Sequence, residues 1–86
     1  MLKIEEISEG TKTILRLSGR IQAEHLIALQ KQCEDIDTIL VFDLREIQLV
    51  DEAAVRFLAA CELNGTVLRH CPGYIREWIR RDSESE

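Results

Sequence analysis

The stretch "ILVFDLREIQLVDEAAVRFL", residues 39–58, decides the fold because it joins two segments of different character. Its start belongs to "TILVF" (38–42), a continuous apolar run of strand length that is typical of a central strand covered on both faces. Residues 51–63 are largely apolar, and the Asn-Gly pair at 64–65 readily ends a helix. We therefore expect a strand, a loop and a helix in that order.

The segments on either side supply the remaining elements. Two short segments rich in β-branched residues flank "SEGT" and predict an antiparallel hairpin that turns at Gly10. Apolar residues at helical spacing predict a first helix, and Pro72 suits the first turn of a last one. The expected elements are strands at 2–7, 12–18, 38–42 and 66–70, and helices at 22–34, at 51–63 and from Pro72 onward. This β-β-α-β-α-β-α order predicts an α/β fold with an open mixed sheet of about four strands and three helices.

Length and charge limit the classes of function. Eighty-six residues suffice for one domain, which we expect at 1–81, with a disordered acidic tail at 82–86. A net charge of −5 argues against binding to nucleic acid. The sequence has no apolar run long enough to cross a membrane, so we expect a cytoplasmic protein without direct membrane insertion. Three cysteines, an odd number without a disulfide pattern, are consistent with reduced thiols.

Three of these segments together resemble the STAS family, which includes the anti-sigma-factor antagonists and a cytoplasmic part of sulfate transporters. "LRLSGRI" (15–21) is similar to the opening of that fold, and "NGTVLRHCPGYIREWI" (64–79) is similar to its later strand and helix. The stretch 39–58 resembles the family signature, in which an apolar strand ends in Asp-Leu and a loop leads to Asp-Ser-Ser/Thr-Gly at a helix start. The resemblance covers roughly residues 12–79 and implies a non-enzymatic regulatory module that binds proteins.

The resemblance also carries over to single positions. The strand-end pair falls on Asp43 and Leu44, the motif's first Asp on Asp51, its two hydroxyl positions on Glu52 and Ala53, and its glycine on Ala54. In the antagonists the second hydroxyl is phosphorylated by the anti-sigma factor, and phosphorylation releases the complex. Ala53 has no hydroxyl, so the resemblance implies a module without this phospho-switch. Constitutive binding and regulation elsewhere both remain open.

The acidic pair at 51–52 also has a purely structural explanation. A helix begins with unpaired N–H groups, and an Asp at the N-cap accepts a hydrogen bond from one of them while its charge favours the helix dipole. Glu52, in the first turn, gains from the same dipole. We therefore predict a cap and a first-turn acid rather than catalytic groups, and we assign no catalytic residue. Mimicry of a phosphate by Glu52 is a weaker hypothesis, since it lies one position early and carries less charge.

The second helix has more apolar surface than one sheet face requires. Ala54, Val55, Leu58 and Cys61 fall on one side, whereas Ala53, Ala60 and Leu63 fall outside and Phe57 lies at a flank. The excess predicts an interface in the region 44–57, although packing of Phe57 against the first helix explains that residue equally well. The candidate partner-binding residues are Leu44, Arg45, Glu46, Asp51, Glu52, Ala53, Arg56 and Phe57.

Three classes of function remain for this chain. The first is an antagonist-like module whose partner is a kinase-like anti-sigma factor. Whether the chain also forms a homodimer stays an open question at this point. The second is a STAS subunit that supports the ATPase of a membrane transporter, such as an ATP-binding-cassette lipid system. The third is a small thiol or metal protein, or an enzyme, that uses Asp51, His70 or Cys71. The spacing of Cys61, His70 and Cys71 lacks a Cys-x2-Cys pair and a fourth ligand, so we predict no metal and no cofactor.

Overall fold

The computed structural model describes residues 2–84, which form an α/β fold with the expected order of strands and helices. A single turn of 3-10 helix, η1, precedes the first α-helix. The fold class predicted from the sequence is confirmed. The elements are β1 (Leu2–Glu9), β2 (Lys12–Ile21), η1 (Ala23–His25), α1 (Leu26–Glu34), β3 (Ile39–Val50), α2 (Glu52–Leu63), β4 (Val67–Arg69) and α3 (Gly73–Glu84).

The four strands of residues 2–84 lie in one open sheet in the order β1-β2-β3-β4. β1 pairs with β2 in the predicted antiparallel hairpin, and Gly10 turns the chain with φ of +64°, a conformation that glycine adopts without steric cost. β2, β3 and β4 are parallel neighbours joined by helical crossovers. β3 is therefore a central strand, as predicted.

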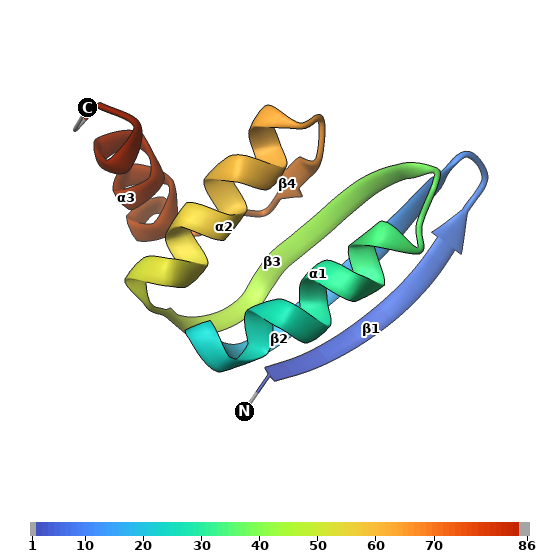
Figure 1. The fold of residues 1–86 in the computed structure, drawn as a ribbon, viewed down its shortest axis with the longest axis horizontal. Coiled ribbons are helices and arrows are strands. Elements are labelled where there is room, and N and C mark those ends of the chain that lie inside the picture. Colours follow the sequence, from blue (N-terminus) through green and yellow to red (C-terminus); the bar gives the residue numbers. More distant parts are fainter. Residues whose placement is uncertain (1, 85–86) are drawn as a thin grey trace.

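Helices α1 and α2 cover the same face of the sheet, and α3 packs against α2 at its outer side (Figure 1). The core lies between this face and the helices. It combines side chains of β2 and β3 with the inner sides of all three helices. Its completely buried members include Leu15, Leu17, Leu29, Phe42, Leu44, Leu58 and Ile75.

β3 is much longer than the predicted strand at 38–42, so the expectation of a loop over 43–50 is wrong. Its second half remains paired with β2, but the register shifts twice, between Arg16 and Ser18 and between Gly19 and Arg20. Each shift places one extra residue in β3, which is the signature of a β-bulge. The two bulges bring Leu44, Ile47 and Val50 to the core at every third position. This spacing hides the alternation by which strands are recognised.

Two further expectations are corrected. The strand at 38–42 was expected to be covered on both faces, but within residues 2–84 the helices lie on one side only, and we call the other side the helix-free face. Val41 is nevertheless buried there, at a register position between Ile14 of β2 and Val67 of β4. The prediction of a disordered tail from residue 82 is also wrong for residues 82–84, since α3 continues to Glu84. Residues 85–86 lie outside the described part of the chain.

Candidate interaction surface at the start of helix α2

Asp51 fixes the start of α2 with both of its carboxylate oxygens. Its backbone is extended, and Oδ1 accepts a hydrogen bond of 2.9 Å from the backbone N–H of Ala54, the predicted N-cap bond. Oδ2 accepts a second bond, also 2.9 Å, from the backbone N–H of Ala23 in η1. These two bonds lower the pKa of Asp51, the Ala54 bond more than the Ala23 bond. The carboxylate therefore joins the connection after β2 to the connection after β3.

The residues after Asp51 present a mixed surface. Glu52 is exposed and forms an ion pair with Arg56 one turn later, and Arg56 also lies 3.7 Å from Asp82 of α3. Ala53 is half-buried, whereas Ala54, at the family's glycine position, is fully buried. A side chain larger than alanine has room at 53 but not at 54. The position that the resemblance equates with the phosphorylated hydroxyl is thus accessible.

Two of the candidate partner-binding residues belong to the core instead. Leu44 is completely buried beneath the helices, so its assignment to a partner surface is wrong. Phe57 is half-buried, and its ring stacks on Phe42 with centroids 6.3 Å apart. Packing inside the domain therefore accounts for much of its apolar surface. At the far end of α2, Ala60 and Leu63 are exposed as predicted, Leu63 by 88%.

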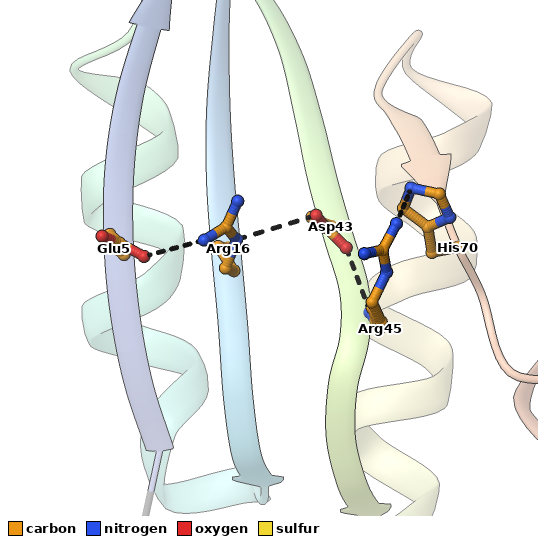
Figure 2. A network of polar contacts seen from close by, with 5 residues as sticks. All are labelled: Glu5, Arg16, Asp43, Arg45 and His70. Carbon is orange, nitrogen blue, oxygen red and sulfur yellow. Dashed lines mark hydrogen bonds and ion pairs between the residues drawn. The ribbon is translucent and has the colours of Figure 1, made fainter.

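The charged candidates before the helix lie away from the Glu52–Arg56 pair. Arg45 is exposed on the helix-free face, where its guanidinium lies 2.8 Å from Nε2 of His70 (Figure 2). Because a guanidinium only donates, Nε2 of His70 accepts, and the ring proton sits on Nδ1. His70 has φ of 55°, a left-handed conformation that is uncommon for residues other than glycine. Glu46 is exposed, and so is Leu49, by 48%.

Sequence reasoning missed a row of charged side chains across the helix-free face. Arg16 of β2 lies between two acids, with its guanidinium 3.4 Å from Glu5 of β1 and 3.8 Å from Asp43 of β3 (Figure 2). Asp43 is almost buried and also accepts a hydrogen bond from the backbone N–H of Arg45. Arg16 and Asp43 each stand between apolar residues in their own strands, and only the strand register reveals that they form one row with Glu5.

The three cysteines are partly buried thiols. Cys33 and Cys61 line a groove of about 850 Å³ between α1 and α2, together with Leu40 and Phe57. Burial, with a smaller effect of Cys33, raises the pKa of Cys61 to about 11, so this thiol is protonated at neutral pH. Among residues 2–84, no three His, Cys, Asp or Glu side chains are grouped to hold a metal ion.

Comparisons with known proteins identify the fold and nothing finer. No protein-family model matches the chain, and no curated protein does. Among solved structures, the chain is similar to one described as "Crystal Structure Analysis of Mglu", with a TM-score of 0.64 and 19% sequence identity. The match covers 80% of this chain and 19% of that chain. Within residues 2–84, no helix has both the length and the apolar character that crossing a membrane requires.

Proposed function

We propose that this chain is a non-enzymatic interaction module of the STAS type, which works in the cytoplasm and binds a protein partner through the start of α2. The contact surface consists of Glu52, Ala53 and Arg56, with the exposed Leu49 before them. Arg45, which is exposed on the helix-free face beside His70, and Glu46 lie outside this contact surface. Leu44 has no direct part, because it is buried.

The observation that carries this proposal is the pair of hydrogen bonds that the Asp51 carboxylate accepts. These bonds fix the backbone beside an accessible surface. A surface that is already ordered loses little conformational entropy when a partner binds. Leu49, exposed by 48%, adds an apolar side chain two positions before Asp51, in the segment that leads into α2. Both carboxylate oxygens of Asp51 already accept hydrogen bonds from backbone N–H groups, so the proposed role of Asp51 is to hold the surface in place rather than to carry out chemistry.

The similarity to the STAS signature at 39–58 supports the class of partner. The α/β fold and its element order agree with what that resemblance implies. Residues 44–57 contain no Ser, Thr or Tyr, so a kinase has no hydroxyl to phosphorylate in this surface. The proposed module therefore binds without the family's release switch. A kinase-like anti-sigma factor and the ATPase subunit of a membrane transporter are the two partner classes, and co-purification with the tagged chain distinguishes them.

The substitution Ala53→Glu tests the surface. It places a negative charge where the resemblance puts the releasing phosphate, and an unpaired charge is costly to desolvate in an apolar contact. With the co-purified partner, we expect titration calorimetry to give at least a tenfold weaker affinity, about 1.4 kcal/mol. The melting temperature should change little, because the side chain at 53 reaches solvent and an acid is favourable in a first helical turn.

Leu63→Glu is the matched control, since it adds the same charge to the same helix at an exposed position near its other end. It should bind the partner with wild-type affinity. Wild-type affinity in folded Ala53→Glu protein would show that the start of α2 is not the interface. Equal losses in both variants would indicate a general effect of charge and would also contradict the proposal.

A further inference from the structure

The helix-free face carries two parallel rows of side chains that run across all four strands. Strand register places Ile7, Ile14, Val41 and Val67 side by side in one row. Two positions later in β2, β3 and β4, and two positions earlier in the antiparallel β1, the register aligns Glu5, Arg16, Asp43 and Arg69 in the adjacent row. Residues two apart in a strand point to the same face, so both rows share the face on which Figure 2 shows Arg16 and Asp43. We call them the apolar row and the charged row.

The apolar row is accessible at its edge. Val67 is 49% exposed. Ile39, which lies two positions before Val41 in β3, is 55% exposed. Within residues 2–84 no helix lies over this face, and Glu5 and Arg16 keep about half of their side-chain surface in solvent. A sheet face with exposed β-branched residues beside paired charges is well suited to cover by another sheet.

The order of charges in the charged row identifies the partner. From β1 to β4 the signs are negative, positive, negative and positive. A two-fold axis lying between β2 and β3, close to the strand direction, reverses this order in a facing copy. Each acid then opposes a base: Glu5 opposes Arg69 of the second copy, and Arg16 opposes its Asp43. The same rotation places the apolar row against itself, so the whole pattern is self-complementary.

We propose that the helix-free face is a homodimer interface, formed by a second copy of this chain in face-to-face sheet packing. Two aligned sheets pack about 10 Å apart, with their strands inclined by about 30°. A partner of one charge would satisfy only half of the charged row and would repel the other half. A flat apolar partner would remove the charged row from water and add no opposite charge to it. Among these partners, only the second copy matches both rows.

The test uses two variants that are incompatible with themselves and compatible with each other. In Glu5→Arg, the introduced base faces native Arg69 of the second copy, and in Arg69→Glu the introduced acid faces native Glu5. Sedimentation velocity over a concentration series should show a reversible wild-type dimer, and each variant should dimerise at least tenfold more weakly. In an equimolar mixture, opposite charges face each other at both positions, so dimerisation should recover.

Glu6→Arg is the control for net charge, because it makes the same change on β1 but on the helix-covered face, where Glu6 accepts a hydrogen bond from Gln32 of α1. It should dimerise like the wild type, and circular dichroism verifies that all variants are folded. A wild-type chain that stays monomeric into the hundred-micromolar range would overturn the proposal. So would failure of the mixture to recover, since that recovery depends on the facing pairs. Ala53→Glu should leave the dimer intact, which separates this inference from the proposed function.

Discussion

Removing the Asp51 carboxylate tests how firmly the start of α2 is held. Asp51→Ala removes the N-cap bond to Ala54, which contributes about 1 kcal/mol to the free energy of unfolding. It also removes the bond to Ala23, worth about 0.5–1.5 kcal/mol. We therefore expect a loss of about 2 kcal/mol in urea denaturation at pH 7. In a domain of this size each kcal/mol lowers the melting temperature by about 4–8 °C.

Asp51→Asn separates the two bonds. Asparagine is as good an N-cap as aspartate, so the bond to Ala54 is kept. The second atom becomes an amide nitrogen, a donor that cannot accept from the Ala23 N–H. The loss of stability should therefore be about half of that in Asp51→Ala. Equal stability of Asp51→Asn and the wild type would show that the bond to Ala23 contributes nothing.

The pH dependence follows from the lowered pKa of Asp51. A carboxyl group whose pKa is lower in the folded state stabilises the fold fully above its unfolded value, about 3.9. That contribution disappears as the pH falls through the lower, folded pKa. The stability difference between the wild type and Asp51→Asn should be constant above about pH 5 and should shrink below pH 4. A difference that stays constant down to acid unfolding would refute the role of the charged carboxylate.

Two other predictions concern the inner side of α2 and the thiols. Leu58 is completely buried, so Leu58→Ala should reduce the free energy of unfolding by about 2–5 kcal/mol. Leu63 is 88% exposed, so Leu63→Ala should change the free energy of unfolding by less than about 0.5 kcal/mol. Urea denaturation compares the two variants. Burial raises the pKa of Cys61 to about 11, so alkylation of Cys61 by iodoacetamide at pH 8, followed by mass spectrometry, should be much slower than alkylation of a cysteine in a peptide. Peptide-like alkylation of Cys61 in folded protein would contradict its burial.

The sequence predicted those parts of the structure that depend on local signals. The bounds of α2 were predicted within one residue, because a cap at Asp51 and the Asn-Gly pair at 64–65 mark its ends. The hairpin turn at Gly10 and the continuous apolar run that begins β3 were equally clear. Each of these signals lies within a few residues and follows from backbone geometry alone.

The errors in the candidate site have one structural cause. The segment "LREIQLV" (44–50) has apolar residues at its first, fourth, sixth and seventh positions, which fits neither a strand nor an amphipathic helix. Two bulges make it a strand whose every third residue is buried. Bulges depend on the pairing with β2, so the segment alone does not reveal them. The assignment of Leu44 to a partner surface followed from treating 43–50 as a loop.

The charged row depends on information that is even less local. Glu5 and Arg69 are 64 positions apart, and their places at opposite ends of one row follow only from three successive strand registers. A shift of one residue in any of these pairings would turn the affected strand's side chains to the opposite face. The charge order is therefore a property of the folded sheet, and it gives a reason to favour the homodimer that the sequence only left open.

The two proposed surfaces can be used at the same time. Helix α2 covers the face of the sheet opposite to the helix-free face, so a dimer leaves the start of each α2 accessible (Figure 1). Such a dimer presents two identical partner sites. If two linked partner chains bind it, the second binding event becomes intramolecular and the overall affinity rises without any new contact. Glu5→Arg should then weaken binding to a bivalent partner but leave binding to a monovalent fragment unchanged, as calorimetry with each form would show. Equal losses for both forms would place Glu5 in the partner site itself and contradict the separation of the two surfaces.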